Sequence, residues 1–219
     1  MHASPICHHE LLLVGAAHEL RTPLTVARGH LELLRRQRAS PFVEVALEEL
    51  DRLGRIVERM LLIAELETEP PASEPVQLRS VLADATAARP EVQIGETVER
   101  EVAGDEDLLL LALDELLANS LERVLPGEQV VVAARASGDG VEISVTGACR
   151  GVDAISEDAF ACFARVDQDR GRAHGGAGLG LAIVRAVAHA HGGRCGVRAR
   201  VAKQGAEWWL WLPALAAGG

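Results

Sequence analysis

Residues 16–30 read AAHELRTPLTVARGH and place a histidine and a glutamate one turn before a proline. An imidazole beside a carboxylate can act as a nucleophile, because Glu19 can hold or accept one ring proton of His18 and so free the other nitrogen to attack phosphorus. Pro23 lacks the N–H that would bond the carbonyl of Glu19, so we expect a bend just beyond the histidine, with Thr22 one turn along on the same face. The alternative is a surface histidine on a polar helix face, which leaves the proline unexplained.

A second pair of residues suits a metal ion. Glu115 and Asn119 are four residues apart in a helix-like stretch, so they share one face of that helix. An amide oxygen suits a magnesium ion that keeps most of its waters and spans nucleotide phosphates, and the carboxylate can organise one of those waters. The alternative is an amphipathic helix whose polar face meets solvent.

A glycine-rich run, GGAGLGL at residues 175–181, opens a predicted helix. Glycines let the backbone approach a phosphate closely, and the helix N-terminus offers free N–H groups and a favourable dipole. Glycine-rich turns also occur without a phosphate ligand, and the run by itself leaves that alternative open.

The first third of the chain must position the histidine, and its apolar residues recur at alternating steps of four and three. This spacing predicts two long helices joined at Ala39-Ser40-Pro41, where the proline suits the first turn of the second helix. Further apolar residues widen each stripe beyond a single seam, so we expect a second copy of the hairpin to cover it in a homodimeric four-helix bundle. The two series are Leu13, Ala17, Leu20, Leu24, Ala27, Leu31 and Leu34, and Val43, Ala46, Leu50, Leu53, Val57, Met60 and Ala64.

An acidic, proline-rich segment follows the hairpin, and beyond it the pattern changes to mixed helix and strand. We therefore predict the fold class α+β, with a helical hairpin at 1–68, a linker at 69–75 and an α/β sandwich domain at 76–219. Helices are expected at 79–88, 105–125 and 178–191, and strands at 76–78, 92–94, 98–102, 129–136, 141–146, 194–201 and 206–212. His189 and His191 close the last helix, where a cationic ring favours the helix dipole.

The composition excludes several classes of function. The formal net charge of −10 would repel a nucleic-acid backbone, and no basic patch offsets it, so we expect no nucleic-acid partner. The apolar runs at 11–17 and 108–113 are far shorter than the ~20 residues that cross a bilayer, so we expect a cytoplasmic chain without direct membrane contact. The four cysteines form no CxxC pair, which argues against a disulfide framework or a zinc site.

The string from His18 to Pro23, HELRTP, resembles the phosphoacceptor box of the bacterial two-component sensor histidine kinases, and the resemblance extends over residues 10–213. It implies that the hairpin dimerises and that the α/β domain is an ATPase of the type shared with gyrase, a heat-shock chaperone and mismatch-repair proteins. His18 would then take the γ-phosphoryl group of ATP and pass it to an aspartate on the receiver domain of a response regulator. Glu19 would be the acid or base, and Thr22 would orient a water during dephosphorylation of that partner.

The resemblance also covers the nucleotide site. Glu115 and Asn119 match the positions that hold Mg²⁺ on ATP in the family, and residues 160–163 match an aromatic box that anchors a lid. Where family members often have a lysine or arginine three residues past the asparagine, this chain has Glu122, with Arg123 next. The resemblance implies that the cofactor-binding residues are Glu115, Asn119, Arg123, Gly151, Arg165, Gly176, Gly178, Leu179 and Gly180, with Glu115 and Asn119 at the metal.

One box departs from the family pattern. The family has an aspartate that bonds the exocyclic amine of adenine and a threonine that supports it, whereas this chain has Gly147 and Ala206 there, and Cys149 in place of a glycine. A hydrogen bond to a charged group is worth about 1.5–3 kcal/mol, so nucleotide binding is expected to weaken by about tenfold to a hundredfold unless another residue substitutes.

Two functions therefore stay open. In the first, the chain is a working kinase, either the cytoplasmic portion of a membrane-anchored receptor or a small kinase that takes its signal from another protein. In the second, it is a non-ATPase dimeric phosphotransfer or phosphatase module whose α/β domain is a degenerate docking platform. Asn119, Gly178 and Gly180 favour the kinase, and the missing aspartate favours the relay.

Overall fold

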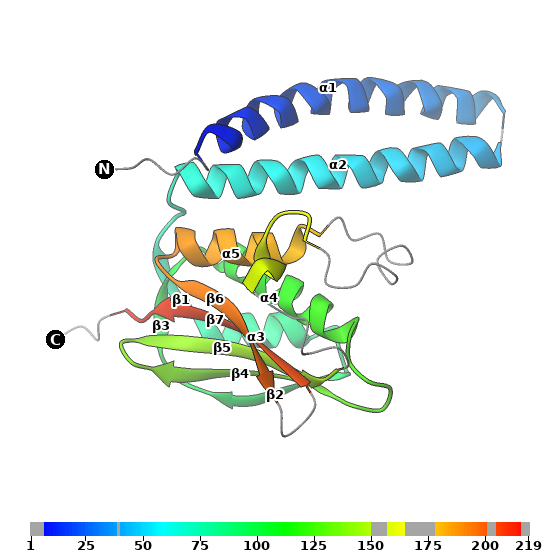
Figure 1. Cartoon of the computed structure of the whole chain (residues 1–219). Coiled ribbons are helices and arrows are strands. Elements are labelled where there is room, and N and C mark those ends of the chain that lie inside the picture. The colour runs from blue at the N-terminus through cyan, green and yellow to red at the C-terminus, as the bar shows by residue number, and fades with distance from the viewer. Residues whose placement is uncertain (1–6, 39, 150–156, 165–177, 201–204, 216–219) are drawn as a thin grey trace. The chain divides into compact units, whose positions relative to one another are not determined.

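The computed structural model describes residues 7–38, 40–149, 157–164, 178–200 and 205–215, with side chains of the first helix described from Leu20 onward. The chain divides into two compact units, residues 1–68 and 69–219. The first unit is a helical hairpin and the second is a mixed α/β unit (Figure 1), which confirms the α+β fold class. No helix among the described residues is both long and apolar enough to span a lipid bilayer.

The hairpin consists of helix α1, Cys7–Gln37, and helix α2, Pro41–Thr68, as the spacing of the apolar residues predicts. Helix α1 runs through Pro23 without a break, and Figure 1 shows it as a curved, continuous ribbon. A proline inside a helix removes one backbone hydrogen bond and crowds the preceding turn, but long flanking helical segments keep the direction of the chain. Just beyond this turn, Thr25 Oγ1 donates to the carbonyl of Arg21 at 2.9 Å.

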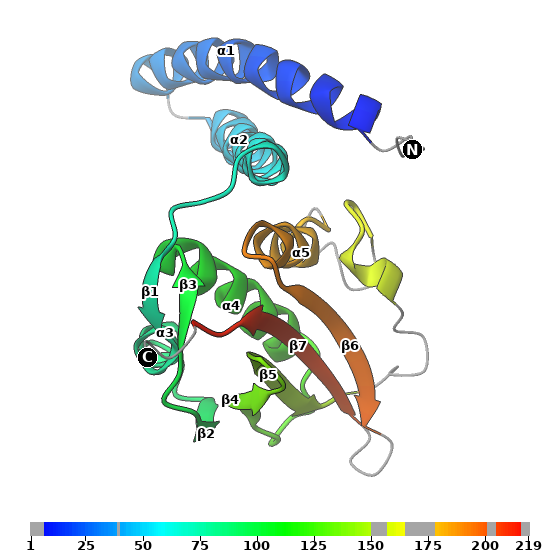
Figure 2. The same cartoon turned by 90° about the vertical axis from the view of Figure 1, so that its left-hand side faces the viewer.

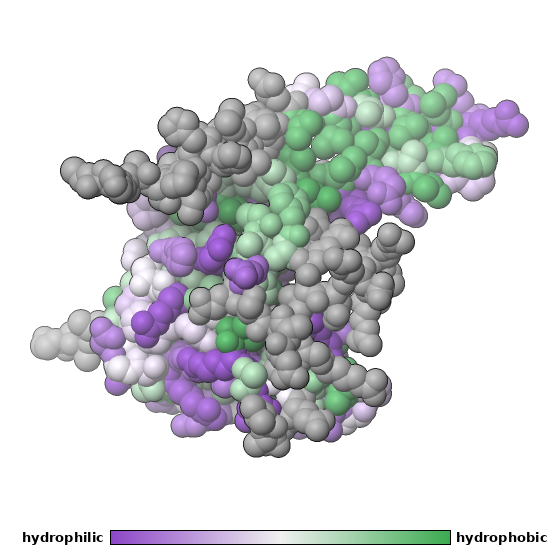
Figure 3. All heavy atoms as spheres, in the orientation of Figure 1, coloured by the Kyte–Doolittle hydropathy of each residue, from purple (hydrophilic) through white to green (hydrophobic). Residues whose placement is uncertain are grey.

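Helices α1 and α2 hold together through a small apolar contact and an ion pair. Leu24 of α1 packs against Val57 and Leu61 of α2, and Arg28 Nη1 lies 2.9 Å from Asp51 Oδ1 across the hairpin. Many large apolar side chains of the hairpin are still exposed, and Figure 3 shows apolar residues gathered along its described part. They are Leu20, Val26, Leu33, Leu34, Phe42, Val45 and Leu53. Two helices alone cannot cover stripes of this width.

The α/β unit is built on a five-stranded sheet of order β2-β4-β5-β7-β6 and a two-stranded sheet of β1 and β3. Strand β2 pairs parallel with β4, and the other neighbours in the large sheet pair antiparallel. Helices α4 and α5 lie together on one face of this sheet (Figure 2), and α3 packs on α4 and β2. The strands are β1 Glu74–Gln77, β2 Val92–Thr97, β3 Glu101–Gly104, β4 Val130–Ser137, β5 Gly140–Ala148, β6 Arg194–Arg200 and β7 Gly205–Pro213. The helices are α3 Leu78–Thr86, α4 Glu106–Leu121 and α5 Gly180–Ala190, with a short 3₁₀ helix at Glu157–Phe160.

Alternate residues of the central strands point toward the helices and form the core. Ile143 and Val145 of β5 face Leu210 and Trp208 of β7 in register, and all four are at most 1% exposed. Successive side chains of a strand point to opposite faces, so this alternation places one face of the sheet against α4 and α5. The helices contribute Leu109, Leu113, Leu116, Leu117, Ile183 and Val187 to the core.

On the other face of the sheet, two arginines of β6 lie over two tryptophans of β7. The Cζ atom of Arg198 lies 4.7 Å from the ring centroid of Trp209, and that of Arg194 lies 4.8 Å from the ring centroid of Trp211. Arg198 also donates two hydrogen bonds of 2.7 Å to Glu142. These bonds hold the pKa of the Glu142 carboxyl below its usual range. The tryptophans of β7 are therefore packing residues, one in the core and two under guanidinium groups.

Several element ends differ from the predicted ones for tertiary reasons. Helix α4 ends at Leu121 rather than at residue 125, because Leu125 N instead donates to Ala148 O at 2.9 Å. Strand β5 continues to Ala148 rather than stopping at residue 146, because β7 pairs with it to the end. Strand β1 begins at Glu74, inside the segment predicted as linker, and it is fixed there by pairing with β3.

His191 links helices α4 and α5 of the α/β unit. Its ring is buried, Nδ1 donates to Val187 O at 2.8 Å, and Nε2 accepts from the backbone N–H of Asp105 at 3.0 Å. Only the neutral ring protonated on Nδ1 satisfies both bonds, so the predicted cationic ring at this helix end is wrong for His191. Asp105 is the N-cap of α4, and its carboxylate accepts from Leu108 N at 3.1 Å. A side chain at Gly104 would overlap the imidazole.

Replacing His191 with alanine is expected to lower the free energy of unfolding of the α/β unit by about 2–3 kcal/mol, because it leaves a buried N–H and a cavity. All three tryptophans lie in β7, so tryptophan fluorescence in a urea titration reports on this unit alone. His189→Ala, at an exposed position of the same helix, is the matched control and should change stability by less than about 0.5 kcal/mol. Equal effects of the two substitutions would contradict the bridging role of His191.

Candidate functional site

The proposed phosphoacceptor lies on the first half of α1. The structure places His18 and Glu19 within this helix, and it describes Thr22, one turn after His18, as exposed. Positions three to four residues apart lie on the same face of a helix, so Thr22 and His18 occupy positions on one face of α1. Pro23 leaves the carbonyl of Glu19 without its helical N–H partner. His18, Glu19 and Thr22 thus lie on one continuous helix, in a turn that lacks one backbone hydrogen bond.

A cavity of about 390 Å³ opens between α1 and α2. Arg21, Thr25 and Arg28 line it from α1, and they lie three, seven and ten residues after His18. This spacing continues the face that carries the histidine. The remaining lining residues are Leu24, Leu50, Asp51, Gly54, Arg55, Val57 and Glu58. The surface of the hairpin beside Arg21 and Arg28 is therefore concave and carries charges of both signs.

The metal-type pair lies on α4, as predicted. Asn119 is half-buried, and its Oδ1 accepts a hydrogen bond of 3.2 Å from Nε of Arg123. The other amide atom, Nδ2, is buried and has no hydrogen-bond partner among the described residues. A buried donor without a partner costs free energy unless a ligand accepts its hydrogen bond. Asn119 is therefore a candidate ligand-binding residue.

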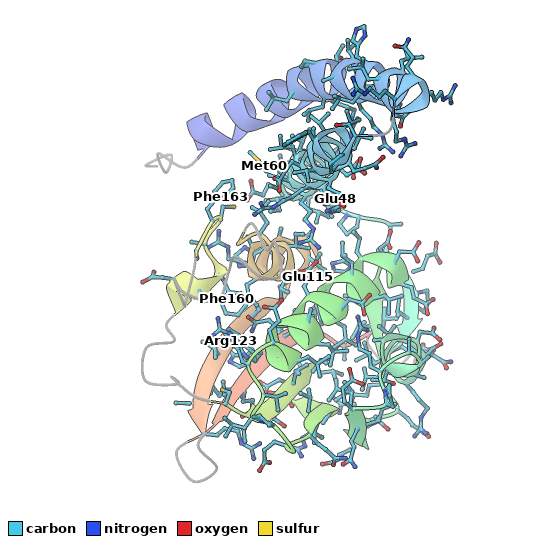
Figure 4. The ribbon with its side chains drawn as sticks, turned by 90° about the vertical axis from the view of Figure 1, so that its right-hand side faces the viewer. Glu48, Met60, Glu115, Arg123, Phe160 and Phe163 are labelled. Atoms are coloured by element: carbon cyan, nitrogen blue, oxygen red, sulfur yellow. The ribbon has the colours of Figure 1, made fainter. Side chains whose placement is uncertain are left out.

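The N-terminus of α5 lies against Glu115. Helix α5 begins at Gly180, and the side chain of its N-cap residue, Leu179, makes no capping hydrogen bond. The first N–H groups of a helix lack partners within the helix, and they favour an anion. A side chain at Gly180 would overlap Glu115 Oε2, so the glycine is what allows the carboxylate to lie there. Figure 4 shows Glu115 projecting between α4 and α5. The fold thus brings together two motifs that are 65 residues apart in the sequence.

Two described residues near the start of α5 have positive φ angles. Gly178 has φ +70° and Phe163 has φ +63°, and Phe163 N donates to Gly178 O at 2.9 Å. A Cβ at Gly178 would lie 2.7 Å from the carbonyl oxygen of Ala164, so only glycine fits. Phe160 is buried and packs edge-on against Trp208 with the ring centroids 5.9 Å apart. Phe160 is thus held in the core of the α/β unit, while Phe163 stays 53% exposed, and the segment at 165–177 that would form the predicted lid lies outside the described residues.

Three of the predicted cofactor-binding residues, Gly151, Arg165 and Gly176, lie outside the residues that the structure describes. Leu179, a fourth, is buried and belongs to the core of the α/β unit. The sequence did not predict the bond between Arg123 and Asn119. Their spacing of four residues was the available signal, because such pairs meet on a helix.

The positions that depart from the family pattern face the interior beside the end of α4. Gly147 pairs with Ala206 across β5 and β7. A Cβ at Gly147 would lie 3.5 Å from Val130 Cγ2 and 3.6 Å from Val124 Cγ2, which is ordinary contact. Cys149 is 5% exposed, and its backbone forms an isolated antiparallel β-bridge with Val124. The described surroundings of Gly147 are therefore small and apolar, with room for a side chain.

The residues at α4 and α5 fit a nucleotide with a magnesium ion. The amide oxygen of Asn119, now bonded to Arg123, and the carboxylate of Glu115 beside Gly180 are oxygen ligands of the kind that a cation needs, and the N-terminus of α5 offers N–H donors for phosphates. Magnesium prefers a few protein oxygens together with phosphates and waters. Glu115 and Asn119 are thus the residues that would hold the ion.

Two family models match the chain. Residues 9–69 match the His Kinase A (phospho-acceptor) domain. Residues 104–216 match the histidine kinase-, DNA gyrase B- and HSP90-like ATPase. These ranges contain the helical hairpin with His18 and the α4–α5 site, respectively.

The curated relatives are sensor proteins. Sensor protein IrlS of Burkholderia pseudomallei is 33% identical over 218 residues, which are 92% of this chain and 46% of that protein. The probable sensor histidine kinase TcrY of Mycobacterium tuberculosis is 34% identical over 205 residues, which are 87% of this chain and 43% of that protein. The chain spans about half the length of the curated relatives that it matches.

Solved structures of the same kind match the fold. Full-length ShkA in complex with AMPPNP has a TM-score of 0.74 at 27% identity, covering 95% of this chain and 46% of that one. The mycobacterial sensor histidine kinase MprB has a TM-score of 0.55 at 26% identity, covering 65% of this chain and 97% of that one. With a phosphoacceptor hairpin followed by a nucleotide-type α/β unit, and with relatives of the same kind along nearly its whole length, the chain belongs to the sensor histidine kinase family.

Proposed function

We propose that the chain is the cytoplasmic core of a sensor histidine kinase, which phosphorylates itself on His18 with the γ-phosphoryl group of ATP and passes this group to an aspartate of a response regulator. In this proposal residues 1–68 are the dimerisation and phosphotransfer hairpin, 69–75 the linker and 76–219 the catalytic domain. The observation that carries it is the placement of Glu115 against Gly180 at the start of α5, in a chain that also carries HELRTP.

Three residues of the hairpin, His18, Glu19 and Thr22, have separate roles in phosphotransfer and dephosphorylation. An imidazole nitrogen of His18 forms a bond to the γ-phosphorus while the bond from that phosphorus to the bridging oxygen breaks, and ADP leaves with the electron pair. Glu19 accepts the ring proton, which keeps the attacking nitrogen nucleophilic. Thr22 orients a water when the phosphorylated regulator is hydrolysed, which gives the same core a phosphatase activity.

The α/β domain binds the phosphates and the metal. N–H groups at the start of α5 donate to phosphate oxygens, and Glu115 and Asn119 hold the magnesium ion. Bound magnesium neutralises charge that develops on the phosphates. Gly151, Arg165 and Gly176 complete the nucleotide site in this proposal, and Arg123 borders it.

The partners follow from the surfaces of the hairpin. Its exposed apolar side chains, such as Leu33, Leu34 and Val45, each more than half exposed, suit a second copy of the hairpin in a homodimeric four-helix bundle. The receiver domain of the response regulator docks on the face of α1 that carries His18, over the cavity lined by Arg21 and Arg28.

A non-ATPase relay is the second candidate, because Gly147 and Ala206 replace the residues that read adenine in the family. Incubation with γ-labelled ATP and magnesium separates the two functions. The kinase is expected to gain an acid-labile, base-stable label from ATP alone. A label that appears only when a phosphorylated response regulator is supplied would favour the relay.

Gly147→Asp is expected to give the site a preference for adenine. The wild type should bind ATP and ITP, which lacks the exocyclic amine, within about threefold of each other, whereas the variant should favour ATP by about tenfold, the value of one added charged hydrogen bond. The nearest atoms to a Cβ at Gly147 are 3.5 Å away, so a Cβ is accommodated there. Displacement of a fluorescent nucleotide measures both affinities.

Ala148→Asp is the matched control for this prediction, because it adds the same charge on the opposite face of β5. It should leave the ratio of the ATP and ITP affinities unchanged. An ATP preference in the wild type above tenfold would show that another residue already reads the base.

A further inference from the structure

The side chain of Arg123 folds back over the end of α4. Helix α4 ends at Leu121, and the N–H of its C-cap, Glu122, donates to Ala118 O. Arg123 follows outside the helix, with its backbone N–H donating to Ser120 O at 3.1 Å. Its Nε atom reaches back one turn to Asn119 Oδ1 at 3.2 Å. Figure 4 shows Arg123 beyond the end of α4 and Glu115 farther back along this helix.

This bond determines the orientation of the Asn119 amide. A guanidinium group only donates hydrogen bonds, so the amide atom that faces Arg123 must be the oxygen. The nitrogen Nδ2 then points away, and it is buried without a partner among the described residues. The amide oxygen of Asn119 is therefore hydrogen-bonded, and its amide nitrogen has no partner among the described residues.

The oxygen that Arg123 holds is the atom that a metal would need. Amide oxygens, and not amide nitrogens, coordinate magnesium. Arginine keeps its charge at every pH that a folded protein meets. A divalent ion and a guanidinium group bound to the same oxygen would repel each other at a separation of a few ångströms. Each cation is therefore expected to weaken the binding of the other at Asn119 Oδ1.

We propose that Arg123 is a positioning residue that competes with the divalent cation for Asn119 Oδ1. With the site empty, the guanidinium group holds the amide with its oxygen presented, and entry of the metal displaces it toward solvent. This inference rests on the proposed function, because it takes Asn119 as a ligand of the magnesium that accompanies ATP. The simpler explanation, an arginine that only stabilises the C-terminal end of a helix, predicts an effect on stability and none on metal dependence.

The test compares the affinity of the full-length chain for a trinitrophenyl derivative of ATP in excess EDTA and in excess magnesium. The dissociation constant in EDTA divided by the one in magnesium measures how much the metal strengthens nucleotide binding. Arg123→Ala is expected to raise this ratio about five- to tenfold over the wild type, because the metal no longer has to displace a charged hydrogen bond. Glu122→Ala, which changes the neighbouring exposed charge, should leave the ratio at the wild-type value.

The double variant Asn119→Ala, Arg123→Ala makes the test specific to the amide. With Asn119 removed, the metal effect should fall toward one, and Arg123→Ala should no longer change it, as expected when two substitutions act through one contact. Thermal unfolding followed by tryptophan fluorescence checks that each variant is folded.

Each outcome decides the proposal. An unchanged or smaller ratio in Arg123→Ala, with normal nucleotide binding in both buffers, would overturn the role of Arg123 and leave the proposed kinase intact. An effect of Arg123→Ala that persists without Asn119 would also overturn it. A wild-type chain that binds the nucleotide in neither buffer would overturn this inference together with the ATP-dependent function.

Discussion

Replacing His18 with glutamine is expected to reduce the label transferred from γ-labelled ATP by at least about a hundredfold, to background. Glutamine has a side chain of similar reach, but its amide nitrogen is not nucleophilic, so no bond to phosphorus can form. Helix α1 already runs through Pro23, and glutamine favours a helix as well as histidine does. The hairpin should therefore stay folded. The label is measured after electrophoresis under alkaline conditions, in which phosphohistidine survives.

His30→Gln is the matched control for this experiment. His30 lies on the same helix at an exposed position, so the substitution makes the same chemical change away from the HELRTP string. It should keep the label at the wild-type level. A His18→Gln variant that still gains an acid-labile label from ATP would show that a different residue is the phosphoacceptor, and the assignment of the hairpin would then be wrong.

Replacing Asn119 with alanine is expected to lower the rate of autophosphorylation by about a hundredfold to a thousandfold, which is typical for loss of one preorganised electrostatic contact. The substitution removes both the oxygen that would hold magnesium and the unpaired Nδ2 donor. The binding of nucleotide in magnesium should weaken toward its value in EDTA. Single-turnover labelling at saturating ATP measures the rate, and nucleotide displacement measures the binding.

Ser120→Ala is the matched control for Asn119. Ser120 is the next residue on α4, it is 4% exposed, and its Oγ has no partner among the described residues. Its loss should leave stability and labelling nearly unchanged, because removing an unsatisfied buried hydroxyl costs little. If Ser120→Ala and Asn119→Ala reduced labelling equally, the effect would come from a disturbed helix rather than from the metal site.

The sequence by itself determined the elements and their chemistry. The alternating steps of four and three predict both long helices, and Pro41 marks the start of the second one, where the structure has it. The sandwich unit follows from short strand-like runs between helical ones, and most of its strands begin or end within two residues of the predicted positions. Such patterns are readable because they depend on neighbours within one or two turns.

Only the tertiary structure decided which of these residues meet. Glu115 lies against Gly180 because α4 and α5 pack side by side on one face of the sheet, and no local pattern specifies that packing. His191 is a neutral bridge and not a cationic helix end, because its ring lies between Val187 and the cap of α4. Strand β5 runs on past residue 146 because β7 pairs with it. In each case the deciding interaction joins residues that are distant in the chain or depends on a burial that only packing creates, so the sequence pattern around either partner could not contain it.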